Sequence, residues 1–362
     1  MPTYQTTPQF EHGKRDTTGI LVVNLGTPAA PTSGAVRRFL RQFLSDPRVV
    51  ELPRALWWLI LNLVILLVRP SRSAAAYQKI WTENGSPLLL YSTSLSDKIR
   101  TRLAANSAPT DIELAMTYGN PSVDSAIDKL LARGAQRILV LPLYPQYSGT
   151  TTASVYDAVN RKLGKLRWVP EIRFINSYHD EPAYISALAD SVQSHWQQHG
   201  RGDKLLMSFH GIPKKNLERG DPYFCQSQKT ARLLAAALDL ADDDWVIAFQ
   251  SRVGAEEWLS PYTDETVKLL AHQGISKLDV VCPGFATDCL ETLEEIAMQN
   301  AEFFTAAGGE SLRYIPALND DDNHVELLAA LATRHMAGWV SQHEAAKAAE
   351  TRERALAMGA PQ

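Results

Sequence analysis

The sequence predicts an α/β protein built from two similar halves, each a parallel β-sheet flanked by helices. Three observations indicate this fold class. Short runs of aliphatic and β-branched residues alternate with longer helical segments along most of the chain. This alternation occurs in two rounds, and strands that alternate with helices form parallel sheets with right-handed crossover connections. The chain of 362 residues is also long enough for two domains of ordinary size, each with its own core.

The first round lies in residues 17–170, which we assign to an N-terminal domain. Strands are predicted at 19–24, 112–118 and 137–143, and helices at 32–44, 88–103, 122–133 and 151–163. The loop after the first strand lacks the G-x-G-x-x-G spacing of a dinucleotide fingerprint and the lysine of a P-loop, so a nucleotide-binding enzyme is disfavoured. Residues 1–16 are polar and contain prolines, which indicates a loosely held tail.

The second round lies in residues 171–330, which we assign to a C-terminal domain. Strands are predicted at 172–175, 204–210, 245–250 and 277–282, and helices at 182–199, 222–240, 261–273 and from Ala286 onward. An alanine-rich helical segment runs from Asn323 to Arg354, so we assign 331–362 to a C-terminal helix and tail. Two domains of this kind leave a cleft between them.

Residues 54–70, the lip segment, form an unusually apolar helix. Only Asn62 interrupts the apolar run from Ala55 to Val68, which is too short to cross a bilayer that needs about twenty residues. The run is apolar on all sides, so it is not an ordinary surface helix. Two interpretations stay open: a helix buried in the core or at a subunit contact, or a lip beside a pocket for a large apolar ligand. In the second, Trp57 and Trp58 would touch a membrane surface. We expect the sequence from Arg69 to Arg72, which contains Pro70, to break the helix.

Charge and cysteine content exclude some classes of function. The 36 basic and 40 acidic residues give a net charge of −4 without a dense basic stripe, which argues against a nucleic-acid partner. Cys225, Cys282 and Cys289 match no zinc or disulfide spacing and are typical of thiols in a reducing cytosol. The N-terminus lacks the pattern of a signal peptide, so we expect a cytoplasmic protein.

A histidine at a strand end is the first candidate for chemistry. His210 closes the strand at 204–210, and Gly211 lets the chain turn away from it. In open α/β sheets, ligands bind at the carboxyl ends of the strands. A histidine in this place is nevertheless more often structural than catalytic, so it needs a second group close to it.

The helix that follows the strand at 277–282 supplies acidic groups. At 100° per residue, one helix face carries Asp288, Glu291, Glu295 and Glu302, while Glu294 lies on another face. A solvated face explains most such stripes, but this one begins beside the presumed cleft. An imidazole and a carboxylate on two strand ends can act as an acid–base pair or bind a divalent transition metal such as Fe²⁺, Co²⁺ or Zn²⁺.

The motifs around these residues carry a family resemblance. They are Ser-Phe-His-Gly-Ile-Pro at 208–213, Phe-Gln-Ser-Arg-Val-Gly at 249–254, Trp-Leu at 258–259, Pro-Gly-Phe at 283–285 and Asp-Cys-Leu-Glu-Thr-Leu-Glu-Glu at 288–295. Further ones are Asn-Leu-Gly-Thr-Pro at 24–28, Ser-Asp-Pro-Arg-Val at 45–49 and Tyr-Pro-Gln-Tyr-Ser at 144–148. In this order, over about residues 18–335, the chain resembles the ferrochelatases, the terminal enzymes of haem synthesis.

The resemblance implies a fold, a reaction and roles for residues. The fold would be two Rossmann-like, chelatase-type domains that hold a porphyrin in their cleft, and the reaction insertion of Fe²⁺ into protoporphyrin IX with release of two protons. His210 would be the active-site imidazole and Glu291 the carboxylate across the macrocycle, both contacting the metal, while Glu295 continues an acidic path for protons or iron. The residues implied to line the pocket are Leu25, Tyr118, Tyr144, Trp258 and Phe285, and those implied to hold the propionates are Arg69, Tyr77 and Ser86.

The chain departs from the family pattern at three places. Cys289 stands where some members have histidine, and Thr117 where some have arginine, so neither residue takes those roles. The C-terminus lacks the cysteines that hold a [2Fe–2S] cluster in some members, and three scattered thiols cannot supply four ligands. We therefore expect no iron–sulfur cluster and no tightly bound cofactor, with Fe²⁺ and protoporphyrin IX as substrates.

Two alternatives remain at this level. A chelatase for coproporphyrin, or for a sirohydrochlorin-type ring with cobalt or nickel, would keep the fold, but more carboxylated rings need more cations than residues 55–68 offer. A haem or porphyrin carrier would use the same pocket without chemistry, and would have no use for an acidic path. We expect a cytoplasmic enzyme with peripheral contact to the inner membrane through 55–68.

Overall fold

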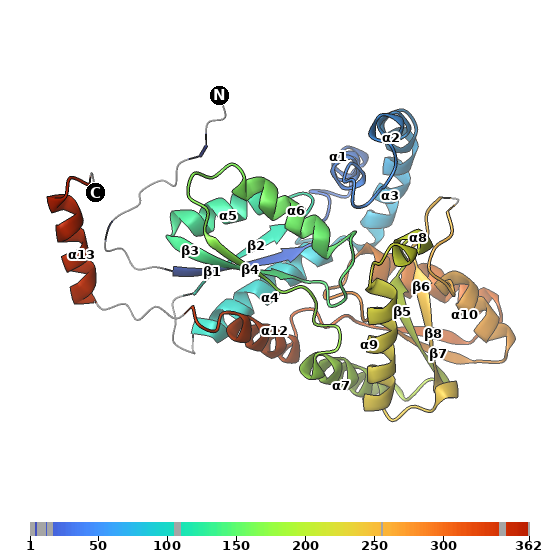
Figure 1. Cartoon of the computed structure of the whole chain (residues 1–362). Coiled ribbons are helices and arrows are strands. Elements are labelled where there is room, and N and C mark those ends of the chain that lie inside the picture. The colour runs from blue at the N-terminus through green and yellow to red at the C-terminus, as the bar shows by residue number, and fades with distance from the viewer. Residues whose placement is uncertain are drawn as a thin grey trace.

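Two four-stranded parallel sheets form the body of the molecule (Figure 1). The computed structural model describes residues 4–5, 12, 17–104, 110–254, 256–339 and 345–360. It confirms the predicted α/β class with parallel sheets flanked by helices. The tail predicted at 1–16 lies for the most part outside the described residues.

The first sheet has the strand order β2-β1-β3-β4. Its strands are β1 (Thr17–Asn24), β2 (Thr110–Met116), β3 (Ala135–Pro142) and β4 (Glu171–Phe174), and the helices of this half include α1 (Ser33–Leu44), α4 (Pro87–Ala104), α5 (Val123–Ala132) and α6 (Thr152–Leu163). The four aliphatic residues 20–23 of β1 are fully buried and point alternately into two different hydrophobic clusters. Both faces of this sheet are therefore covered, as expected for parallel strands.

The second sheet repeats the arrangement with the order β6-β5-β7-β8. Its strands are β5 (Lys204–His210), β6 (Trp245–Gln250), β7 (Lys277–Val281) and β8 (Ser311–Ile315), and its helices are α7 (Pro182–His199), α8 (Lys214–Glu218), α9 (Tyr223–Ala237), α10 (Thr263–His272), the π-helix η3 (Glu291–Asn300) and α11 (Ala301–Ala306). One hydrophobic cluster contains residues of both sheets, for example Val22 of β1 and Met207 of β5. The helix α12 (Asp322–His335) packs against α4 and β3 of the first half and α7 of the second, so it joins the two halves.

Three elements differ from the sequence-based prediction. The strand Glu171–Phe174, which we assigned to the second half, pairs with β3 and completes the first sheet. The sequence prediction does not include the strand β8, because its run Ser311–Ile315 is only five residues long and is interrupted by the charged Arg313. The helix predicted from 323 to 354 is two helices, α12 and α13 (Ala345–Ala357), and residues 340–344 between them lie outside the described residues.

The lip segment is part of a long helical projection that stands out from the body at the top of Figure 1. The projection consists of α2 (Arg54–Ile60), the π-helical turn η1 (Leu61–Ile65) and α3 (Leu66–Ile80), and the lip segment is its first part, residues 54–70. Among the described residues, Arg54–Ile80 is the one helix long and apolar enough, by length and composition, to cross a membrane. Pro70 lies inside α3 and does not break it, since Leu66, Pro70, Ala74 and Tyr77 are buried along one side and this packing offsets the lost hydrogen bond.

The two faces of the lip segment have different environments. Trp57, Leu61 and Leu66 are buried in a cluster with α1, and the indole of Trp57 donates a hydrogen bond to the carbonyl of Leu44 at 2.6 Å. The opposite side, which we call the lip face, is solvent-exposed and apolar: Leu56, Trp58, Leu59, Leu63, Val64, Leu67 and Val68. The interpretation as a buried helix thus describes the face that packs against α1, and the interpretation as an apolar lip describes the exposed face. Trp57 was expected at the surface but is buried.

Candidate active site

The carboxyl edge of the second sheet positions His210. It is the last residue of β5, it is partly exposed, and its Nδ1 lies 2.6 Å from the carbonyl oxygen of Gly211. A Cβ atom on Gly211 would lie 2.8 Å from the carbonyl oxygen of Gln250 and 3.2 Å from the ring of Trp258. Glycine is therefore required here by close packing, because it lets the chain turn between β6 and Trp258 directly after the histidine.

Glu291 begins η3, which follows β7 through a turn at 283–287. Its backbone is held from the neighbouring strand: the amide Nε2 of Gln250 donates to the Glu291 carbonyl at 2.8 Å, and the Oε1 of Gln250 accepts from Ser208 at 2.7 Å. Gln250 thus connects the His210 strand to the start of the helix that carries Glu291. The sequence places Gln250 within the motif Phe-Gln-Ser-Arg-Val-Gly but indicates no role for its side chain.

Both carboxylate oxygens of Glu295 are held by hydrogen bonds from Ser251. The backbone N–H of Ser251 donates to its Oε1 at 2.7 Å, and the Ser251 hydroxyl donates to its Oε2. Ser251 adopts a left-handed conformation with φ of 66°, an uncommon one for serine, which brings both donors to the same carboxylate. Burial raises the pKa of Glu295, the bonds from Ser251 and the His210 imidazole oppose that rise, and Glu291 adds to it. Glu295 is therefore within electrostatic reach of both His210 and Glu291.

The acidic stripe predicted from Asp288 to Glu302 is only partly correct. Asp288 precedes the helix and is buried, with hydrogen bonds to its carboxylate from Thr292, Tyr314 and Asn319, so its role is structural. Glu302 lies in α11 and is exposed. The stripe assumed an α-helix, whereas η3 is a π-helix whose i→i+5 hydrogen bonds put more residues in each turn, so the spacing from 291 to 302 no longer returns to one face.

Contacts between the two halves fix the other wall of the site. The Asn24 amide at the end of β1 donates to Ser92 and to Thr287, each at 3.0 Å, and Thr287 lies just before η3. Gly26, at φ of 113°, brings the loop after β1 so close to Tyr118 that a Cβ there would lie 1.8 Å from the Tyr118 carbonyl oxygen. The ends of β1, β2 and η3 therefore stay at fixed positions relative to one another.

The residues implied to hold propionates lie on or near α3. Arg69 is partly buried; burial lowers its pKa and the charge of Glu291 opposes that change. Tyr77 is buried, and burial, reinforced by Glu291 and Cys289, raises its pKa. Ser86 is also buried and accepts a hydrogen bond from Thr27 at 2.8 Å. Arg69 and Tyr77 are thus near Glu291, whereas the Ser86 hydroxyl is already bonded within the protein.

The residues implied to line the pocket fall into two groups. The side chains that are partly exposed are Leu25, Tyr144, Trp258 and Phe285, and the ring of Phe285 lies 6.3 Å from that of His210. Tyr118 is buried: its hydroxyl donates to Asp46 at 2.6 Å, and its ring packs edge-on against Phe43. Tyr118 therefore stabilises the loop before the lip segment, at the back of this wall.

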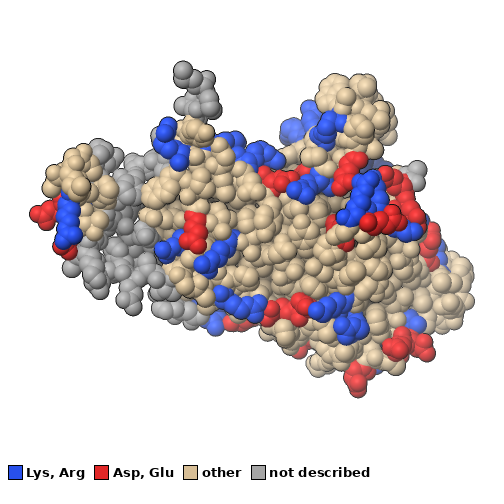
Figure 2. Space-filling model, viewed as in Figure 1, with Lys and Arg blue, Asp and Glu red and all other residues tan. Residues whose placement is uncertain are grey.

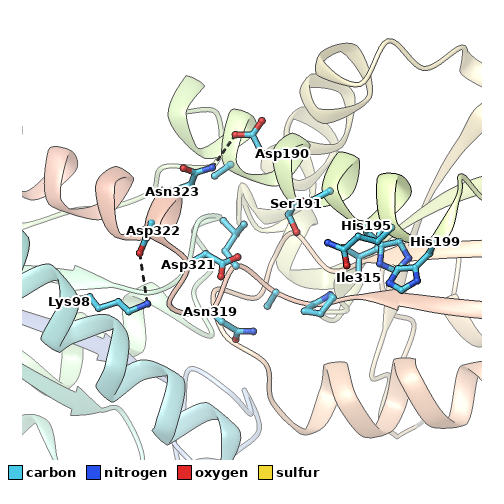
Figure 3. A pocket seen from close by; sticks show the side chains of 16 residues that line it. Lys98, Asp190, Ser191, His195, His199, Ile315, Asn319, Asp321, Asp322 and Asn323 are labelled. Atoms are coloured by element: carbon cyan, nitrogen blue, oxygen red, sulfur yellow. Dashed lines mark hydrogen bonds and ion pairs between the residues drawn. The ribbon is translucent and has the colours of Figure 1, made fainter.

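A separate cavity of about 740 Å³ lies between α7 and the β8–α12 loop (Figure 3). None of the candidate site residues lines it. Two of its polar contacts are the ion pair of Lys98 with Asp322 and the hydrogen bond that Asn323 donates to Asp190. The residues predicted to carry the chemistry therefore lie at the edge of the second sheet and not in this cavity.

Comparison with known proteins places the chain in a family. The family model "Ferrochelatase" matches residues 17–336. The chain belongs to the ferrochelatase family. It is 54% identical over 361 residues to a ferrochelatase of Thioalkalivibrio sulfidiphilus, with 97% of each chain covered, and 53% identical over 360 residues to one of Nitrosococcus oceani, with 98% of each covered. The predicted resemblance over about residues 18–335 is confirmed.

Solved structures agree on the fold. A chain described as SirB from Bacillus subtilis with Fe³⁺ superposes with a TM-score of 0.53 at 12% identity, over 91% of this chain and 99% of that one. At this identity the likeness shows the chelatase-type fold alone. That likeness therefore says nothing about the roles of His210 and Glu291.

Proposed function

We propose that the protein inserts Fe²⁺ into protoporphyrin IX, giving protohaem and two protons, and that His210 and Glu291 act from opposite faces of the ring. The proposed reaction is supported by the match of the ferrochelatase family model over residues 17–336. It is also supported by 54% and 53% sequence identity to two ferrochelatases over nearly their full length. The residue roles are supported by the geometry of one sheet edge, where His210 ends β5 and Gln250 of the neighbouring strand holds the backbone of Glu291. Fe²⁺ and the porphyrin are substrates in this proposal.

Metal insertion replaces two pyrrole N–H bonds by metal–nitrogen bonds, so two protons must leave the ring. The carbonyl of Gly211 accepts a hydrogen bond from His210 when the ring proton is on Nδ1, and Nε2 then keeps its lone pair. That lone pair can accept a pyrrole proton or contact Fe²⁺. In our proposal, Glu291 and Glu295 then pass protons from the other face toward Ser251 and solvent.

The macrocycle would lie between His210 and η3, with its edge toward α3. Phe285 and Trp258, both partly exposed near His210, offer flat apolar surface to the ring. Arg69 supplies a partly buried cation for one propionate, and a charge-assisted hydrogen bond of this kind is stronger than a neutral one. The remaining residues assigned to the porphyrin site would support the side of the site near α3: Leu25, Tyr77, Ser86, Tyr118 and Tyr144.

The lip face is proposed to rest on the surface of the inner membrane, with the protein otherwise in the cytoplasm. Trp58 is 59%, Leu63 60% and Val68 71% exposed, which is a large contiguous apolar surface for water to cover. Figure 2 shows a tip free of charge over α2, with basic side chains at its flank. An interfacial helix binds by such an apolar face combined with cations that attract anionic lipids.

Vesicle co-sedimentation tests this contact. Wild-type protein should sediment with vesicles that contain anionic lipid, and a Trp58→Ser/Leu63→Ser/Val68→Ser variant should remain in the supernatant. Leu269→Ser, which removes an exposed apolar side chain from α10, is the matched control and should sediment like wild type. Equal sedimentation of all three proteins would contradict the proposed membrane contact.

The reaction itself is tested with purified protein under anaerobic conditions. Fe²⁺ or Zn²⁺ is mixed with protoporphyrin IX, coproporphyrin or a sirohydrochlorin, and the absorption change of the metallated product is followed. We expect the highest kcat/KM with protoporphyrin IX and Fe²⁺. Turnover only with one of the other rings would assign a different substrate, and tight porphyrin binding without product would indicate a carrier.

A further inference from the structure

An ion pair connects the lip to the helix of the acidic residues. Lys79, near the end of α3, places its Nζ 2.8 Å from Oε1 of Glu294 in η3, although the two residues are 215 positions apart in sequence. The Glu294 side chain is only 6% exposed, whereas that of Lys79 is 53% exposed. Gln299 adds hydrogen bonds to both oxygens of the same carboxylate, at 3.2 and 2.9 Å. The carboxylate is therefore buried with one cation and one amide as its partners.

The ion pair lies between groups with proposed roles on both sides. On α3, Tyr77 is two residues before Lys79, and Arg69 lies on the same helix. On η3, Glu291 is three residues before Glu294 and Glu295 is the next residue. Leu290 and Leu293 pack against the cluster formed by α1 and the lip segment, so the ion pair continues an apolar contact between the same two elements.

An ion pair in this position helps to fix the distance between α3 and η3. Removing the cation would leave a buried carboxylate with only an amide partner, and such a group moves toward water rather than staying unpaired. Movement of η3 away from α3 would change the separation between Arg69 and Glu291. Both residues are proposed to contact one porphyrin. A change in their separation should therefore weaken porphyrin binding more than it slows proton transfer at His210.

We propose that the Lys79–Glu294 ion pair is a positioning device that holds α3 against η3 and thereby sets the affinity of the site for the porphyrin. This inference rests on the proposed function and deepens it. Neither residue is a catalytic residue, because each acts through the placement of others. The pair joins the helix proposed to hold a propionate to the helix that carries Glu291.

The test is a set of variants measured with porphyrin and metal separately varied. Lys79→Met keeps the aliphatic stem and removes the charge. We expect KM for protoporphyrin to rise by roughly two- to fivefold, since a partly exposed ion pair contributes about a factor of that size. The kcat and the KM for the metal should stay within about twofold of wild type. Lys79→Arg keeps the charge and should restore wild-type KM.

A double-mutant cycle shows whether the pair itself is responsible. Glu294→Gln should raise KM for porphyrin like Lys79→Met, and the double variant should be no worse than the worse single variant. Arg102→Met, which breaks the exposed ion pair with Glu326 between α4 and α12, is the matched control and should leave KM unchanged. Thermal unfolding of each variant reports any general loss of stability.

Several outcomes would overturn the inference. Unchanged KM in Lys79→Met, a fall in kcat without a change in KM, additive effects in the double variant, or failure of Lys79→Arg to restore KM would each contradict it. Porphyrin binding followed by fluorescence gives the same comparison without turnover. If wild type binds porphyrin but forms no product, the proposed reaction fails while the ion pair is still tested by the binding constants.

Discussion

The hydroxyl of Ser251 offers a direct test of the acidic path. In the structure, Glu295 accepts one hydrogen bond from the Ser251 backbone and one from its hydroxyl, and both lower a pKa that burial has raised. Ser251→Ala removes the hydroxyl and keeps the backbone donor. Because the ionised carboxylate loses a donor, the pKa of Glu295 should rise further.

The size of the effect follows from the strength of one such bond. A hydrogen bond to a charged group contributes about 1.5–3 kcal/mol net, and 1.36 kcal/mol corresponds to one pKa unit, so the loss raises the pKa by about one to two units. The remaining Ser251 N–H, at 2.7 Å, retains part of the stabilisation, which places the expected shift near the lower end. At any pH on the acid limb, a smaller fraction of Glu295 would then be ionised.

The assay is the pH dependence of kcat, measured by the fluorescence change when Zn²⁺ enters protoporphyrin. If Glu295 must be ionised to pass protons, the acid limb of the profile for Ser251→Ala moves up by about one pH unit relative to wild type. Ser251→Gly removes the same hydroxyl but suits φ of 66° better, so an equal shift in both variants separates the lost bond from backbone strain.

The control is Ser94→Ala, which removes a serine-to-carboxylate bond with Asp320 between α4 and the loop before α12. Its pH profile should match wild type. Coincident acid limbs for wild type, Ser251→Ala and Ser251→Gly would show that ionisation of Glu295 does not limit turnover, and our role for it would be wrong.

Three further predictions concern chemistry and stability. His210→Ala and Glu291→Gln should each lower kcat by at least about 100-fold, the usual contribution of one acid or base, while porphyrin binding measured by fluorescence quenching persists. Burial lowers the pKa of His324 from 6.5 to about 4, so the folded state binds fewer protons and stability is lost as the pH falls through 6.5 toward 4. Between pH 7 and pH 5, the loss of stability measured by denaturant unfolding should be about 2 kcal/mol larger in wild type than in His324→Gln. Gly26→Ala should destabilise the protein by about 3 kcal/mol or more, measured the same way, because the new Cβ would collide with the Tyr118 carbonyl.

Much of the fold could be predicted because the sequence pattern is local and strong. The helix 182–199 and the strands 204–210 and 245–250 were predicted with the bounds that the structure has. Their buried runs are bounded by polar or turn residues, so periodicity alone locates them. The strand at 171–174 was assigned to the wrong half for the opposite reason: its partner, β3, is a long-range choice that no local pattern encodes.

The sequence names candidate residues for the site but not the contacts that position them, and the roles of the candidates stay predictions. His210 and Glu291 follow strand-end patterns and a family motif, whereas the contact of Lys79 with Glu294 joins segments 215 residues apart. The π-helical hydrogen bonding of η3 was not predictable either, since nothing in the sequence distinguishes it from an α-helix, and the stripe to Glu302 failed with it. The lip segment was ambiguous because a helix apolar on all sides does not indicate which side is covered.

The two sides of the site differ in how their positions are determined, and this difference predicts how mutations act. His210 ends a central strand with pairing partners on both sides of β5, and Gly211 fixes the turn that follows, so its place depends on the sheet. Glu291 begins a π-helix, a rare form, and its place depends on side-chain contacts from other segments, those of Gln250 among them. Changes near His210 should therefore act on kcat. Changes in contacts that place η3 without touching Glu291 or Glu295 should act first on porphyrin KM. A loss of kcat at constant KM in Asn24→Ala, which removes the hydrogen bond from β1 to Thr287 just before η3, would contradict that division.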